Sequence, residues 1–287
     1  MKKTNVCIFV MLLLNLITLH GVEKKTSTKG YNGLYMGHSF FWPSVKELKI
    51  IMPETNVTGH QQSTVFSGGA SGSPGRLWDS RRKRAEGQKI LDSKKINLLV
   101  MTYYSPENSS VEHYSRWFDY ALSKNPQTTF MVAIPWAGQL YKMDKKQRAR
   151  SKMGIHRIYQ SVIVKLRKKY PKNKILYCPY GVGTYELINQ FEAGKLPGVK
   201  HILNLNRQKR VASKKNNDQL LNDELGHPGK LVISVATLLW LQTIYEYDVS
   251  AMKHKRITGL PKIDFVSISA EVHKTIKPFN AVYEKKP

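Results

Sequence analysis

The sequence predicts an α/β protein, built as a three-layer α/β/α sandwich around a central, mainly parallel sheet. Two observations carry this prediction. Short apolar runs alternate along the chain with longer segments whose apolar residues recur at helical spacing. The runs are continuous rather than alternating with polar residues, which is typical of parallel strands covered by helices on both faces.

The expected strands are short and apolar. The first ends on glycine and is followed directly by a helical pattern, which gives a strand, turn and helix as the opening unit. Strands are predicted at 33–37, 96–101, 130–134 and 174–178, and two further short strands at 201–205 and 265–268.

The expected helices differ in how much of their surface is apolar. The segment 145–169 is strongly basic with one apolar face, whereas 227–247 is apolar nearly all round and is predicted to be largely buried. The helices are predicted at 42–52, 77–91, 110–123, 145–169, 184–193 and 227–247.

Two segments are predicted to be irregular. Residues 59–76 are rich in glycine and serine, which indicates a loop where the backbone comes close to another group. Residues 195–222 are polar and basic, and no internal repeat is found.

The N-terminus has the pattern of a signal peptide. Lys2 and Lys3 precede an apolar run at 6–19, and Gly21 offers a cleavage point, so residues 1–21 are expected to direct export. The run is short for a membrane span, although an uncleaved anchor is the alternative. We therefore expect a secreted or periplasmic protein with no membrane span in the mature chain. A flexible leader is expected at 22–30 and a single domain at 31–287, with the basic irregular segment at 195–222 inside it.

The cysteine count excludes several classes of protein. Cys7 lies in the predicted leader, so the mature chain keeps only Cys178. An internal disulfide, a cysteine-based zinc site and a CxxC redox centre are therefore excluded.

The chain is strongly basic, with a net charge of +26, or +24 without Lys2 and Lys3. Such a field favours anionic partners such as acidic polysaccharide, nucleic acid or anionic lipid. The charge lies in short clusters, each of which a solvated surface also explains. The clusters are at 81–84, 145–152, 165–169 and 209–215.

Three segments are expected to meet at the carboxyl edge of the sheet, where sites form in parallel α/β folds. Ser39 follows the first strand and precedes a helix, so it is either a nucleophile or a helix cap. The glycines at 68–75 either contribute backbone N–H groups that bind an oxyanion or simply form a flexible loop. At 222–229 an acid precedes His227, as in an acid–histidine pair or the start of a helix.

Together these motifs resemble the SGNH (GDSL-like) hydrolase superfamily. Gly37-His38-Ser39-Phe40 is similar to its first block, 69–73 to its second, and 223–227 to its acid–histidine block, in the same order across 31–247. The resemblance implies a flavodoxin-like α/β/α domain that hydrolyses an ester without a metal or organic cofactor.

Residue by residue, the resemblance implies Ser39 as nucleophile, His227 as general base and Asp223 as the residue that orients His227. Backbone N–H groups of Ser39 and Gly72, with Gly69 as the alternative, would bind the oxyanion.

The sequence also departs from the family pattern. His38 replaces the usual aspartate beside the serine, and Glu224 rather than Asp223 would give the usual spacing to the histidine, so Glu224 is the alternative acid. The Gly-x-Asn-Asp block is absent after the strand at 96–101, where Asn108 or a tyrosine hydroxyl is expected to supply the third oxyanion donor.

The expected function is hydrolysis of a small-molecule or glycan ester. The alternative is a protein with the same fold and a decayed site that binds anionic polysaccharide. A nucleic-acid partner is disfavoured, because the leader implies export and no nucleic-acid motif is present. Four residues could stack on a sugar, although packing explains each as well: Trp42, His60, Trp78 and Trp136.

Overall fold

The computed structural model describes residues 27–205, 218–252 and 263–283. Its centre is a sheet of five parallel strands in the order β4-β2-β5-β6-β7. The strands are β2 (Asn32–Gly37), β4 (Gln61–Phe66), β5 (Leu98–Thr102), β6 (Thr129–Ala133) and β7 (Ile175–Cys178). Numbered within the sheet along the chain, this is the order 2-1-3-4-5 of flavodoxin-like folds.

Of the described α-helices, six lie between strands along the chain and three follow the last strand. They are α1 (Trp42–Ile51), α2 (Pro74–Asp79), α3 (Arg81–Leu91), α4 (Val111–Lys124), α5 (Lys145–Ile158), α6 (Val164–Lys169), α7 (Gly181–Glu192), α8 (Lys230–Tyr245) and α9 (Phe265–Ile276). A π-helical turn at Tyr159–Ile163 joins α5 to α6, so the basic helix expected at 145–169 is present. The helix expected at 77–91 is instead two helices, because the Ser80 hydroxyl caps α3 by accepting the N–H of Lys83.

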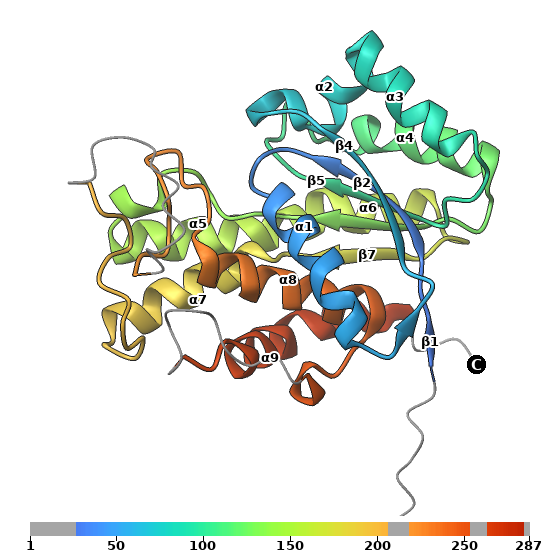
Figure 1. Ribbon diagram of the computed structural model, residues 1–287. Helices are drawn as coiled ribbons and strands as arrows, with labels where there is room; N and C mark the ends of the chain where they lie inside the picture. Colours follow the sequence, from blue (N-terminus) through green and yellow to red (C-terminus); the bar gives the residue numbers. More distant parts are fainter. Residues whose placement is uncertain (1–26, 206–217, 253–262, 284–287) are drawn as a thin grey trace, which may run out of the picture.

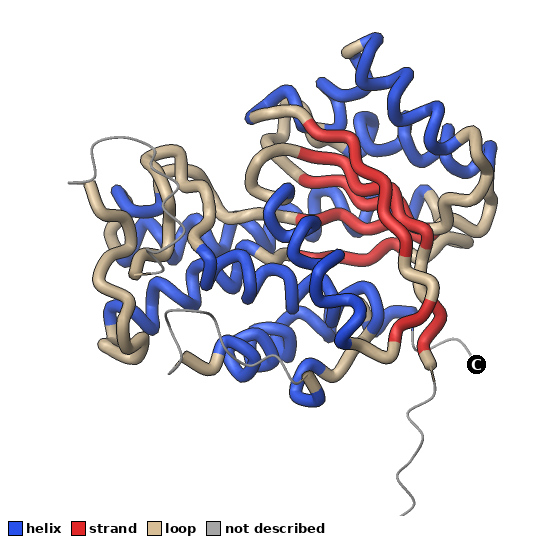
Figure 2. The backbone as a smooth tube through the Cα atoms, viewed as in Figure 1, coloured by secondary structure: helices blue, strands red, loops and turns tan. Residues whose placement is uncertain are grey.

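Helices cover both faces of the sheet, which confirms the predicted α/β/α sandwich (Figures 1 and 2). On one face, Tyr35 of β2 stacks on Trp240 of α8, at 6.1 Å between ring centroids. On the other face, Phe130 of β6 stacks on Phe118 of α4 at 3.8 Å. The apolar α8 lies between the sheet, α1, α7 and α9, which explains why nearly all of its side chains are buried.

The edge strand β4 was not predicted from the sequence. The loop expected at 59–76 contains β4, which pairs in parallel with β2 from Asn32 opposite Gln61 to Gly37 opposite Phe66. As an edge strand, β4 buries only Val65 completely, and its remaining residues include Gln, Ser and Thr. It therefore lacks the continuous apolar run that identifies the inner strands.

Two predicted short strands are wrong. At 201–205 there is only an isolated bridge between His201 and Gln219. The segment 265–268 begins α9 instead, and Asp264 caps it by accepting the N–H of Ser267 at 3.0 Å. The buried residues of α9 recur at helical spacing over its twelve positions, a period that four residues cannot show.

The N-terminal leader is only partly described. Within the segment expected to be flexible at 22–30, Thr28–Lys29 forms β1, which pairs in parallel with β3 (Val57–Thr58). The predicted signal peptide at 1–21 lies outside the described residues. Within those residues, the structure contains no helix of the length and apolarity required to cross a bilayer.

Candidate active site

The carboxyl ends of the strands bring the three predicted segments together. Ser39 lies two residues after β2, and the 3₁₀ turn Gly69–Gly72 follows β4. The segment 222–229 precedes α8, so its residues are far from Ser39 in the sequence and close to it in space. The site lies where the strand order reverses, next to the first strand, as expected for open parallel sheets.

Ser39, His227 and Asp223 form one continuous hydrogen-bonded chain. The Oγ of Ser39 lies 2.7 Å from Nε2 of His227, across 188 residues of sequence. On the other side of the ring, Nδ1 of His227 lies 2.6 Å from Oδ2 of Asp223. With Nδ1–H donating to the carboxylate, Nε2 is free to accept the hydroxyl proton, which is the tautomer a general base requires.

Asp223, and not Glu224, is the acid in contact with the histidine. Its Oδ1 also accepts the backbone N–H groups of Leu225 at 3.0 Å and His227 at 3.2 Å. Burial alone would raise the pKa of Asp223, but the hydrogen bonds from His227 and Leu225 outweigh burial and lower that pKa below its ordinary value. Glu224 is exposed to solvent.

The histidine loop is held in place by an aromatic cluster. Phe40 stacks on Trp136 with ring centroids 5.0 Å apart and meets His227 edge-on at 5.5 Å. The indole Nε1–H of Trp136 donates to the carbonyl of Gly226 at 2.9 Å. Gly226 has φ of +91°, a conformation that favours glycine and that places this carbonyl next to the histidine. These contacts fix the imidazole on the side of Ser39.

The two predicted glycine donors differ in placement. Gly69 lines the cavity beside Ser39, and as the first residue of a 3₁₀ turn its N–H has no acceptor within that turn. Gly72 is buried beneath the cavity floor, where a Cβ would lie 2.5 Å from the Ser67 carbonyl oxygen and 2.6 Å from that of Gly37. Gly72 therefore allows the turn to pack on the strand ends, and Gly69 is the glycine positioned to face a substrate.

Asn108 is not brought to the site. The backbone carbonyl of Asn108 accepts the N–H of Gly75 at 3.0 Å, and Asn108 does not line the cavity that contains Ser39. From the segment after β5, Tyr104 lines the cavity instead and is 45 % exposed. From the sequence, a tyrosine hydroxyl was the alternative to Asn108 for the third oxyanion donor, and Tyr104 is the tyrosine after β5 that lines the cavity.

The cavity over Ser39 has a volume of about 670 Å³. Its wall is predominantly apolar, with the Ser39–His227 pair as its reactive groups. The residues that line it are His38, Ser39, Phe40, Gly68, Gly69, Tyr104, Pro135, Trp136, Ala137, Gly138, Leu225 and His227. Within the segment 135–138, only Trp136 was considered from the sequence, as a residue that could stack on a sugar, although the whole segment follows the carboxyl end of β6 and the rule for parallel sheets points to it.

Other reactive or aromatic candidates have structural roles. Burial raises the pKa of the Cys178 thiol to about 12, so this residue is not a nucleophile. Of the four residues considered for sugar stacking, only Trp136 lines the cavity. Trp42 packs on Phe66, Trp78 on Trp117, and His60 bonds Tyr245 and Gln62.

His38, the residue before Ser39, is a buried neutral histidine. Its Nε2 lies 3.1 Å from the carbonyl oxygen of Tyr103, and its Nδ1 accepts the N–H of Phe40 at 3.4 Å. Burial lowers the pKa of His38 to about 4; the bond to Tyr103 opposes this effect and the nearby His227 adds to it. His38 thus fixes the backbone on either side of Ser39 without carrying charge at neutral pH.

Acid should destabilise the fold through His38. In the unfolded chain this histidine binds a proton near pH 6.5, whereas in the folded chain it does so only near pH 4. Lowering the pH from 7 to 4.5 should therefore favour unfolding by about 2–3 kcal/mol through this group. The measurement is the free energy of unfolding in urea at both pH values, for the parent and for His38→Gln. His273, whose pKa is also lowered to about 4, is present in both proteins, so the difference between them isolates the contribution of His38. If the parent and His38→Gln lost the same amount of stability between pH 7 and pH 4.5, His38 would not be the group whose protonation favours unfolding.

The fold and site therefore define an α/β protein with a Ser-His-Asp chain at the switch point of a five-stranded parallel sheet. No family model and no curated protein sequence matches the chain. Among solved structures, it is similar to a crystal structure of a DUF4886 family protein from Bacteroides uniformis ATCC 8492, with a TM-score of 0.59. The two chains are 16 % identical, and the match covers 90 % of this chain and 96 % of the other. At this identity the likeness shows the fold alone.

Proposed function

We propose that the protein is a serine ester hydrolase of the SGNH type. The observation that carries the proposal is the hydrogen-bonded chain Ser39–His227–Asp223 at the edge of an apolar cavity. A serine hydroxyl within proton-transfer reach of an imidazole, which is itself oriented by a carboxylate, has the geometry of an activated nucleophile.

The proposed reaction proceeds in two acyl-transfer steps. His227 takes the Ser39 proton as Oγ attacks the ester carbonyl, and it then gives that proton to the departing alcohol as the C–O bond breaks. Water, deprotonated by His227, cleaves the resulting acyl-serine, and the proton returns to Ser39. The N–H groups of Ser39 and Gly69 are proposed to stabilise the oxyanion in both steps. No metal or organic cofactor takes part in this scheme.

An acyl group on a glycan is the proposed substrate. Tyr104 and Leu225, which are 45 % and 55 % exposed, stand at the cavity rim, where a sugar ring can pack on them. The signal-peptide pattern at 1–21 supports a secreted or periplasmic location, where such esters would be met.

The test is covalent capture by an alkyl fluorophosphonate. The expected result is one phosphonate adduct per chain, mapped by peptide mass spectrometry to Ser39, because the probe reacts only with an activated serine. An intact protein mass that stays unchanged after prolonged incubation would remove Ser39 as nucleophile.

A second function, binding of anionic polysaccharide without cleavage, is favoured by the exposed basic residues of α3, α5 and α6. It predicts salt-sensitive retention on an anionic glycan together with no phosphonate adduct. The same capture experiment therefore separates the two functions.

A further inference from the structure

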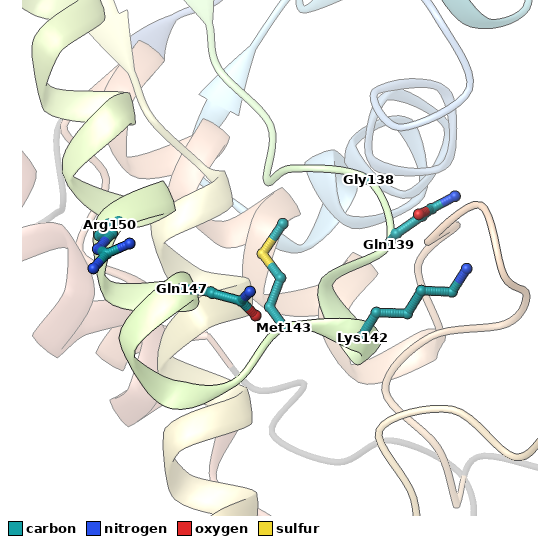
Figure 3. Close-up of a pocket in the computed structure, with 6 residues that line it drawn as sticks. All are labelled: Gly138, Gln139, Lys142, Met143, Gln147 and Arg150. Carbon is teal, nitrogen blue, oxygen red and sulfur yellow. The ribbon is translucent and has the colours of Figure 1, made fainter.

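A second cavity adjoins the one over Ser39. It has a volume of about 380 Å³ and shares the wall residue Gly138 with the first cavity (Figure 3). Its lining is polar and basic, in contrast to the apolar cavity beside it. The residues that line it are Gly138, Gln139, Lys142, Met143, Gln147 and Arg150.

The shared wall belongs to the structure that holds the histidine. A Cβ on Gly226 would lie 3.3 Å from the backbone nitrogen of Gln139, so the acid–histidine loop packs directly on this segment. Gln139 itself has φ of +57°, and its carbonyl accepts the N–H of Lys142 at 3.0 Å, which closes a tight turn. Backbone contacts therefore hold the Gly138–Gln139 wall of the second cavity against the loop that carries the histidine.

Two cations border this cavity. Lys142 comes from the turn after Gln139, and Arg150 comes from α5 on the opposite side, with Met143 and Gln147 between them (Figure 3). Within the described part of the chain, no carboxylate lies within ion-pair distance of either Lys142 or Arg150.

One carboxylate, that of Asp144, adjoins a lining residue in the sequence and is already hydrogen-bonded. The Asp144 carboxylate caps α5 by accepting the N–H of Gln147 at 2.7 Å, and it is not part of the lining. The side-chain amides of Gln139 and Gln147 can donate to an anion, and the arginine fork matches a carboxylate or a sulfate. The lining thus has donors and positive charge without a carboxylate to oppose them.

We infer that this cavity is a subsite for an anionic sugar residue next to the acylated one, so that the enzyme prefers esters of acidic glycans. The inference rests on the proposed function, since Gly138 connects this cavity to the Ser39 site. The acyl group would occupy the apolar cavity while Lys142 and Arg150 bind the neighbouring carboxylate or sulfate. Electrostatic preference of this kind weakens as salt screens the charges.

The test compares two acetylated substrates of similar length, oligogalacturonate and xylo-oligosaccharide, by acetate release. The parent is expected to favour the anionic substrate in kcat/KM. The double variant Lys142→Gln/Arg150→Gln should lower that preference about tenfold, as expected for two ion pairs made by exposed side chains, and leave the neutral substrate unaffected. The matched control is Arg81→Gln/Arg82→Gln on α3, which removes the same charge away from the cavity and should keep the preference.

Each outcome decides between the two proposals. If both substrates are turned over and the double variant keeps the parent's preference for the anionic one, the subsite inference is wrong and the proposed hydrolase function stands. An equal loss of preference in the α3 control would show that overall charge, and not this cavity, selects the substrate. Acetate release from neither substrate, nor from neutral p-nitrophenyl acetate, would overturn the hydrolase and the subsite with it.

Discussion

Replacing Ser39 with alanine should lower kcat for ester cleavage by about 10⁴- to 10⁶-fold, the range seen when a triad nucleophile is removed. The substitution removes the only atom that bonds Nε2 of His227 at 2.7 Å within the described structure, and water held there is a poorer nucleophile. The oxyanion donors and the cavity remain, so KM for a chromogenic ester should change little. The measurement is steady-state hydrolysis of p-nitrophenyl acetate at pH 7.5.

The fold should survive this change. Ser39 is half-buried, and the variant loses one side-chain hydrogen bond, which costs about 0.5–1.5 kcal/mol. Urea unfolding measures that loss. Ser71→Ala is the matched control, because Ser71 is an exposed serine in the neighbouring glycine turn and should keep full turnover. Parent-like turnover of Ser39→Ala would end the serine mechanism.

The sequence predicted four of the five strands of the sheet, because the strands that are buried on both faces are identified by composition alone. Strands β5, β6 and β7 are buried on both faces, so each appears as an apolar run with no partner needed to recognise it. The edge strand β4 has one exposed side and its pairing with β2 is a tertiary property. The beginning of α9 resembles a strand over four residues and shows its period only over twelve.

The site was predicted from motif order, and its finer assignments needed coordinates. Spacing along the chain left Asp223 and Glu224 open, because either acid can be next to a histidine in sequence. Only one of them can point at Nδ1 once the loop is closed by the N–H groups that Asp223 accepts. The resemblance favoured Gly72 as the oxyanion donor with Gly69 as the alternative, and the packing of Gly72 against the carbonyl of Gly37 reverses that order.

Contacts made by the strand-end loops were not foreseeable. The bond from Trp136 to the Gly226 carbonyl joins residues 90 positions apart, and neither residue type signals it. The adjoining basic cavity depends on the same loops, because Gly138 and Gln139 pack on Gly226. Such sites follow from which strand ends meet, and they become predictable only when the strand order is known.

Replacing Asp223 with asparagine should lower kcat by about 10⁴-fold at pH 7.5, with little change in KM. The asparagine carbonyl can keep the two backbone N–H groups of Leu225 and His227, which leaves its amide NH₂ facing Nδ1 of His227. A donor at that position favours the tautomer with the proton on Nε2. Nε2 then cannot accept the Ser39 proton, so the geometry remains while the base is lost.

Glu224→Gln is the matched control for Asp223→Asn, since it removes the same charge one residue away on an exposed side chain and should leave turnover unchanged. Because the pKa of Asp223 lies below its ordinary value, the carboxylate is ionised at neutral pH, and the loss in Asp223→Asn should be present at every pH from 5 to 9. A large loss in Glu224→Gln with parent-like turnover of Asp223→Asn would reassign the acid. The hydrogen bond at 2.6 Å between Asp223 and His227 would then be a structural contact, and the orientation of His227 would depend on Phe40 and Trp136 alone.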